Sequence, residues 1–153
     1  MTTMTATTTQ VYQLFIKATP EAIWEAITDP EFTVRYYHGC RVESTFEPGA
    51  EYRGWSSDRS ELWVEGEVTE STPPRRLVHT WRALYDPETA LEEPSRVTWE
   101  IDQRDNGVTL LTVVHDRLEG APKTAAGVSG EGWVHVLSGL KTLLETGEPL
   151  ARA

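Results

Sequence analysis

The sequence lacks the features that mark several large classes of protein. Among its 153 residues there is a single cysteine, Cys40, which excludes an intramolecular disulfide and a cysteine-rich metal site. No apolar run approaches the roughly 20 residues that a membrane-spanning helix needs. The first ten residues, MTTMTATTTQ, lack the basic and apolar regions of a signal peptide. These absences predict a cytoplasmic protein without membrane insertion, stabilised by a hydrophobic core.

Positive charge is also scarce. The chain has 14 Lys and Arg residues against 24 Asp and Glu, which gives a net charge of -10, and Arg75-Arg76 is the only adjacent basic pair. Affinity for phosphate backbones and for anionic membranes depends on clustered basic residues. We therefore expect no nucleic-acid partner.

Motifs of common enzymes are missing as well. The chain has no G-x-S-x-G elbow, no phosphate-binding glycine loop, no dinucleotide fingerprint and no H-E-x-x-H. Two strand histidines, His79 and His115, have no third ligand at a recognisable spacing. The sequence therefore gives no catalytic residue, no metal site and no cofactor.

What is present fits one soluble α+β domain. The chain is 39% hydrophobic and 25% charged, values typical of a single globular domain of this length. Residues 1–9 are nearly all Thr, Ala and Met without periodicity, which predicts a disordered tail. We expect the domain over 10–148 and a short tail over 149–153.

The N-terminal part predicts one strand followed by two helices. The segment 11–18, VYQLFIKA, alternates so that Tyr12, Leu14 and Ile16 share one side of a strand. Thr19-Pro20 is a helix start, and the helix runs to about residue 28. Asp29-Pro30 repeats the start signal and predicts a second, short helix through Tyr36.

The middle and the end predict an antiparallel meander and a long helix. Short runs with period-two character alternate with turn formers, and predict strands over 41–46, 50–55, 62–71, 76–84, 95–103 and 108–117. The acidic segment 85–94 is expected to be an exposed hairpin loop. The last helix is predicted by an apolar stripe at helical spacing and by Gly147 as its end; the stripe consists of Trp133, Val136, Leu137, Leu140, Leu143 and Leu144.

In their order, five stretches of the chain resemble a known family. They are FIKATPEAIWEAITDPEFTVRYYHG, FEPGAEYRG, PPRRLVHTWR, TLLTVVHD and GWVHVLSGLKTLLE. They resemble the bacterial homologues of the C-terminal domain of the heat-shock-protein-90 ATPase activator, within the START-related SRPBCC superfamily. The resemblance covers about residues 11–147. It implies a helix-grip fold, in which a curved antiparallel sheet of about seven strands wraps the long last helix around a hydrophobic cavity.

The superfamily register implies which side chains face that cavity. Strand and helix residues would point toward one another and contact a ligand, namely His79, Trp81, Trp99, Ile101, Leu111, Val113, His115, Trp133 and Leu137. Phe32 and Tyr36, with Tyr37 and His38, come from the short helix and its exit near the cavity mouth, where they either gate entry or fasten the helix to the sheet. The same rings also fit an ordinary filled core, and this alternative stays open.

The resemblance leaves several functions open, because the superfamily includes lipid carriers, hormone receptors and polyketide cyclases. We expect a non-enzymatic binding or carrier protein for a small hydrophobic or aromatic molecule. One alternative is a cyclase, dehydratase or hydrolase that uses His79 or His115. Another is a protein-interaction module that acts on a chaperone or a regulator. A homodimer is a further expectation, to which an exposed Trp63 would contribute.

Overall fold

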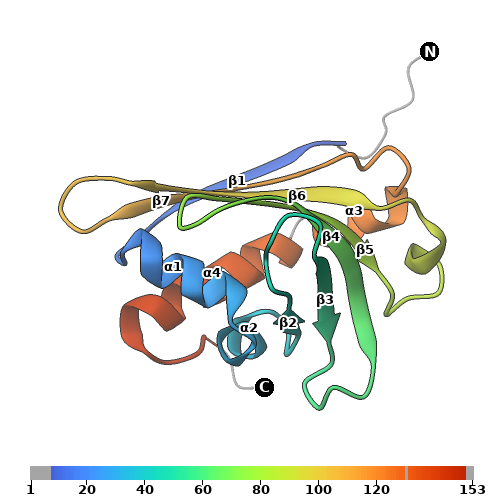
Figure 1. Ribbon diagram of the computed structural model, residues 1–153, viewed down its shortest axis with the longest axis horizontal. Coiled ribbons are helices and arrows are strands. Elements are labelled where there is room, and N and C mark those ends of the chain that lie inside the picture. The colour runs from blue at the N-terminus through green and yellow to red at the C-terminus, as the bar shows by residue number, and fades with distance from the viewer. Residues whose placement is uncertain (1–7, 130, 151–153) are drawn as a thin grey trace.

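The chain folds as a curved antiparallel sheet packed on its C-terminal helix (Figure 1). The computed structural model describes residues 8–129 and 131–150. Seven strands follow the order β1-β7-β6-β5-β4-β3-β2. Their bounds are β1 Gln10–Ile16, β2 Arg41–Glu43, β3 Glu51–Trp55, β4 Leu62–Thr72, β5 Arg76–Ala83, β6 Ser95–Gln103 and β7 Thr109–Asp116. The predicted α+β helix-grip architecture is confirmed.

The helices begin and end where local chemistry dictates. The Thr19 hydroxyl accepts from the Ala22 N–H at the start of α1 (Pro20–Thr28), and the Asp29 carboxylate accepts from the Glu31 N–H at the start of α2 (Pro30–Tyr36). The last helix, α4 (Glu131–Thr146), ends at Gly147, which adopts a φ of 80°. All three helices match the elements expected from the sequence. No helix in the described residues has the length and apolarity to span a membrane.

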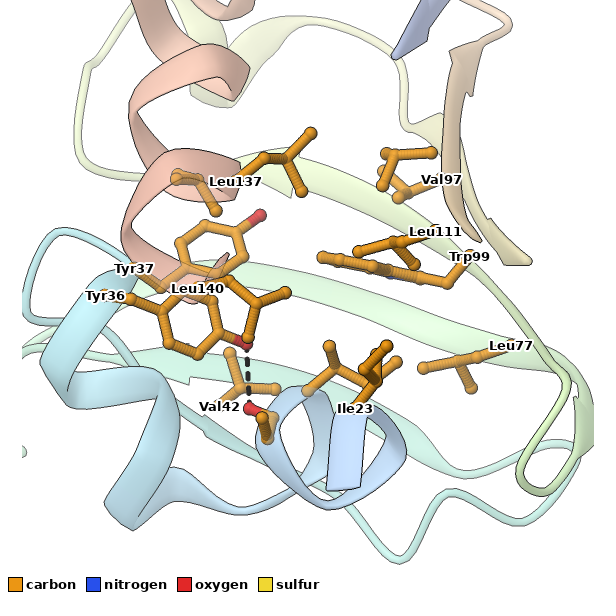
Figure 2. Packing of buried hydrophobic residues seen from close by; sticks show 14 of the residues in the cluster. Ile23, Tyr36, Tyr37, Val42, Leu77, Val97, Trp99, Leu111, Leu137 and Leu140 are labelled. Atoms are coloured by element: carbon orange, nitrogen blue, oxygen red, sulfur yellow. Dashed lines mark hydrogen bonds between the residues drawn. The ribbon is translucent and has the colours of Figure 1, made fainter. Parts of the chain in front are cut away.

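The core lies between the inner face of the sheet and helices α1, α2 and α4 (Figure 2). In the register of β6 and β7, Trp99 faces Val113 and Ile101 faces Leu111, so these four side chains share the inner face. Ile23 of α1 and Leu140 of α4 pack against them, and both are completely buried. The predicted strand alternation therefore places the apolar residues as expected.

Three local differences from the sequence prediction have identifiable causes. The strand predicted over 41–46 ends at Glu43, because Phe46 adopts a φ of 58° and its N–H bonds the Ser44 hydroxyl. The strand predicted over 11–18 ends at Ile16, because the Ala18 N–H turns back to the Ile16 carbonyl. Trp63 is half-buried, packs partly on the core and donates to Glu61, so it is less exposed than expected.

A larger difference concerns the segments on either side of β6 and β7. The loop expected over 85–94 contains a short 3₁₀ helix, η1 (Thr89–Leu91), with Thr89 buried. The Gly- and Ala-rich segment after β7 contains a helix that the sequence did not predict, α3 (Pro122–Val128). Residues 1–7 of the expected N-terminal tail and 151–153 of the expected C-terminal tail lie outside the described residues.

Candidate functional site

The predicted ligand-facing side chains come together in one buried cluster. Those of the sheet and of α4 are at most 5% exposed, namely His79, Trp81, Trp99, Ile101, Leu111, Val113, His115, Trp133 and Leu137. The inward register expected for them is therefore correct. Whether they bind a ligand is a separate question, which depends on the space and the free polar groups around them.

His79 is held between two hydrogen bonds. The Trp99 indole N–H donates to Nε2 of His79 at 3.1 Å, and Nδ1 of His79 lies 2.9 Å from the Thr80 carbonyl oxygen. Because an indole N–H can only donate, Nε2 carries the lone pair and Nδ1 carries the proton. The Tyr52 ring stacks on this imidazole at 3.7 Å between centroids. Both ring nitrogens of His79 are therefore occupied by protein partners.

His115 is held in the opposite tautomer. The Trp133 indole N–H donates to Nδ1 of His115 at 3.0 Å, so the proton lies on Nε2, 2.7 Å from the Ser95 hydroxyl. The hydroxyl then donates to the Trp81 carbonyl oxygen at 2.9 Å. This chain of bonds joins α4 to three strands of the sheet. It fastens α4 to the sheet at Trp133.

Burial keeps both imidazoles neutral. Desolvation lowers the pKa of His79 to about 3 and that of His115 to about 4, and neither side chain is exposed. A general acid or base must reach the substrate and change its protonation state near the working pH. With both nitrogens bonded and no exposed surface, the geometry gives no support to the hypothesis of an enzyme that uses these histidines.

The side chains beside these groups pack closely. A void wide enough for water would leave exposed area on the side chains lining it, and Leu77, Val97 and Leu111 have none. Tyr36 is also buried, and its hydroxyl donates to the Ala26 carbonyl at 2.8 Å, so it fastens α2 to α1 (Figure 2). Phe32 is half-buried and packs beside it on the core. These contacts agree with the interpretation that Tyr36 and Phe32 fasten the short helix, rather than with the one in which they gate entry to a cavity.

An open groove lies at one end of this core, between the exit of α2, the end of β5 and the two C-terminal helices. Its volume is about 80 Å³, and its lining is largely aromatic: Tyr37, His38, Trp81, Tyr85, Gly127, Val128, Gly132, Trp133 and Val136. Small-molecule pockets usually measure roughly 300–1,000 Å³. The groove as folded is therefore smaller than most small-molecule pockets.

Tyr37 and Trp81 place their polar atoms side by side in the groove. The Trp81 indole N–H interacts with the Tyr37 phenol oxygen, so the phenol O–H is the group that can donate to a further partner. Burial raises the pKa of Tyr37, while the Trp81 indole lowers it, so the phenol stays protonated. His38, at the rim, stacks on His135 of α4 at 5.0 Å between centroids. Among the described residues no carboxylate lines the groove, although the chain has 24 acidic residues.

The segment that covers the groove is held by polar contacts. Ala121 supplies no side-chain cap to α3, and the Glu92 carboxylate does so instead, accepting from the N–H groups of Lys123 at 2.7 Å and Thr124 at 3.0 Å. Lys123 also pairs with Asp86 at 3.1 Å. Ala125 of α3 packs in a small cluster with Leu118 and Ala121, while Val128 packs on the main core and the Ala125 carbonyl accepts from the Gln10 amide at 3.0 Å.

The sequence identified only part of this groove. Trp81 and Trp133 were among the predicted ligand contacts, and Tyr37 and His38 were placed near the mouth. Tyr85, Val128 and Val136 were missed as lining residues. The 85–94 segment and the segment before α4 carried no periodic signal, so nothing local indicated that they meet. No group of three metal-binding side chains occurs among residues 8–129 and 131–150.

Comparison with known proteins agrees with this architecture. The model of the family described as "Activator of Hsp90 ATPase homolog 1-like protein" matches residues 17–145. A search of curated proteins found no significant match. CalU16 from Micromonospora echinospora is 21% identical, and the alignment covers 92% of this chain and 76% of that chain with a TM-score of 0.69.

Two further solved structures cover nearly the whole of both chains. PFC0360w, an HSP90 activator from Plasmodium falciparum, is 22% identical over 94% of this chain and 99% of that one, with a TM-score of 0.68. The Aha1 dimer from Colwellia psychrerythraea is 19% identical over 91% and 97%, also with a TM-score of 0.68. At these identities the likeness establishes the fold.

Proposed function

The chain belongs to the family of Activator of Hsp90 ATPase homolog 1-like proteins, and we propose that it binds a small planar aromatic molecule with a hydrogen-bond acceptor in the groove of Tyr37, Trp81 and Trp133. The observation that carries this proposal is the pairing of aromatic walls with the Tyr37 phenol, in a groove whose described lining has no carboxylate. Aromatic walls favour a flat ring, and the phenol O–H favours a carbonyl or carboxylate oxygen.

The volume restricts the ligand and the place where it binds. A groove of about 80 Å³ admits one ring edge, and the remainder of the ligand would lie over Tyr85, which is exposed. Displacement of α3 would enlarge the site, at the cost of the bonds that Glu92, Lys123 and Gln10 make with neighbouring segments. In this proposal Trp81 and Trp133 contact the ligand. The other predicted residues support the groove from within the core.

Binding can be tested by titrating the protein with aromatic carboxylates such as salicylate, indole-3-acetate and 1-naphthoate. Tryptophan fluorescence and NMR chemical shifts serve as the readouts. Tyr37→Phe removes one donor and keeps the ring, so affinity for the carboxylates should fall roughly 5–10-fold. Val128→Trp fills the groove and should abolish binding. Val134→Trp on the exposed face of α4 is the matched control. Binding that survives Val128→Trp unchanged would exclude this groove.

A second candidate is an interaction with a chaperone, favoured by the full-length match to an HSP90 activator. It predicts that the purified chain stimulates the ATPase of a bacterial Hsp90-type chaperone. The measurement is the steady-state ATPase rate with and without the chain. An unchanged rate at saturating concentrations would remove this candidate.

Three broader expectations stay proposals alongside these. We propose that residues 10–148 act as a single domain and that the protein works in the cytoplasm. A homodimer is proposed as well, supported by the dimeric state given for the Colwellia relative. The surface that would form such a dimer is argued from different residues below.

A further inference from the structure

The first strand forms a free edge of the sheet. Within residues 8–129 and 131–150, β1 pairs with β7 alone and stands at the end of the strand order. In an antiparallel pair, the N–H and C=O of alternate residues point away from the neighbouring strand. The Lys17 N–H bonds Glu145 at 2.7 Å and the Phe15 carbonyl accepts from Lys141 at 2.6 Å, so odd-numbered residues point to the open side. The backbone groups of Val11 and Gln13 are therefore free to pair.

The strand itself carries none of the usual protection against pairing, and the side chains of Lys141 and Glu145 cover only its C-terminal end. Exposed edge strands commonly carry a lysine, a proline or a bulge that prevents them from joining another sheet. The sequence of β1, QVYQLFI, contains no charge and no proline, and its register with β7 is continuous. A chain with a net charge of -10 repels its own copies elsewhere, but this strand does not.

Apolar side chains continue around the edge on the outer face. Val11 is 58% exposed and Phe15 is 56% exposed. Their cross-strand neighbours on β7 are Val114 and Leu110, both half-buried. The four side chains form an apolar patch in two pairs, separated by Gln13, whose amide donates to the Thr112 hydroxyl.

The patch is complementary to itself. If two copies of β1 pair antiparallel about Gln13, Val11 faces the partner's Phe15, and Phe15 faces the partner's Val11. Four apolar side chains then lie in a row across the interface. They are Leu110 and Phe15 of one copy, the partner's Val11 and the partner's Val114. A two-fold axis requires this kind of matching, in which one patch meets its own copy.

We propose that the chain forms a two-fold symmetric homodimer by antiparallel pairing of β1 with the same strand of a second copy. This inference names the surface of the homodimer proposed above and rests on that proposal. The pairing extends from Val11 to Phe15. Lys141, which bonds the Phe15 carbonyl in the single chain, must share or release that carbonyl on pairing, and Glu145 occupies the edge beyond it at Lys17. The two sheets join into one continuous sheet.

The test is the oligomeric state of the full chain by sedimentation equilibrium and light scattering. The wild type should be a dimer, and Phe15→Glu and Val11→Lys should each raise the dissociation constant at least about tenfold. The double variant V11K/F15E should recover dimerisation, because the opposite charges face each other only in this register. Gln13→Pro should also give a monomer, because it removes an outward N–H that the monomer does not use.

The controls distinguish an error in the proposed β1 interface from an error in the proposed dimeric state. Leu91→Glu changes a side chain that is 88% exposed on η1 and should leave the dimer unchanged. Thermal unfolding shows that each variant is folded. A wild-type chain that is monomeric at all concentrations overturns both the homodimer and this surface. A wild-type dimer that survives all the β1 substitutions overturns the surface alone.

Discussion

Lowering the pH from 7 to 5 is expected to destabilise the protein strongly, through its two buried histidines. In the folded state the pKa of His79 is about 3 and that of His115 is about 4, whereas in the unfolded chain both are near 6.5. The neutral form is thus favoured by folding. The stabilisation is fully present above pH 6.5, and it is lost as the pH falls from 6.5 toward the folded values.

The magnitude follows from the linkage of protonation to folding. One pKa unit corresponds to about 1.36 kcal/mol, so at pH 5 each imidazole lowers the unfolding free energy by about 2 kcal/mol and the pair by about 4 kcal/mol. That is a large part of the roughly 5–15 kcal/mol typical of a domain. Near pH 5.5 the slope of the unfolding free energy against pH should approach the value for two protons taken up on unfolding.

Carboxylates do not interfere in this window. Their pKa values are lowered by hydrogen bonds and nearby cations, so the stability they contribute is lost only below about pH 4.5. The groups concerned are Glu43, Asp58, Asp86, Glu92, Asp116 and Glu145. Between pH 6.5 and 5 the slope therefore reports mainly on histidines.

The assay is urea unfolding at pH 7, 6 and 5, followed by tryptophan fluorescence. His115→Gln should remove about half of the slope, whatever its effect on stability at pH 7. His135→Gln is the control, because His135 is exposed on α4. NMR of the ring nitrogens should show the proton on Nδ1 of His79 and on Nε2 of His115. An unfolding free energy that stays constant from pH 7 to 5 would refute this account of the core.

Three further substitutions test single contacts. Glu92→Gln weakens the remote cap of α3, so hydrogen exchange over 122–128 should accelerate while global unfolding changes by about 1 kcal/mol or less. Ser95→Ala leaves a buried imidazole N–H unpaired and should cost roughly 1–3 kcal/mol in urea unfolding. Gly66→Ala places a methyl group 2.0 Å from a facing carbonyl oxygen and should lower the melting temperature sharply. Gly127→Ala, which meets open space, is its matched control.

The sequence predicted those elements whose signals are local. Thr19 and Asp29 mark the two helix starts with side chains that bond N–H groups two or three residues away. Strand alternation likewise fixes which face of β6 and β7 is buried. The helix α3 was missed because its cap comes from Glu92, roughly 30 residues away. A start signal that comes from so distant a residue leaves no pattern in the local sequence.

The candidate site was only partly predictable for a related reason. The alternation of β5 and β7 correctly predicted that both histidines face inward. Their tautomers, however, depend on which imidazole nitrogen accepts the indole N–H of a tryptophan from another element. Trp99 and His79 are 20 residues apart and meet within a few tenths of an ångström of ideal distance. Whether such rings leave a cavity or fill it is decided at that scale, which composition and periodicity do not resolve.

The hydrogen bonds of the inner-face tryptophans decide where a polar ligand atom can bind. Trp99 and Trp133 each donate to a histidine, so a ligand that displaced either ring would leave a buried N–H and a buried imidazole without partners. The Trp81 indole bonds no histidine; it interacts with the Tyr37 phenol oxygen, and both rings line the groove. A ligand that accepts from the Tyr37 hydroxyl, as proposed above, would leave both tryptophan–histidine bonds intact.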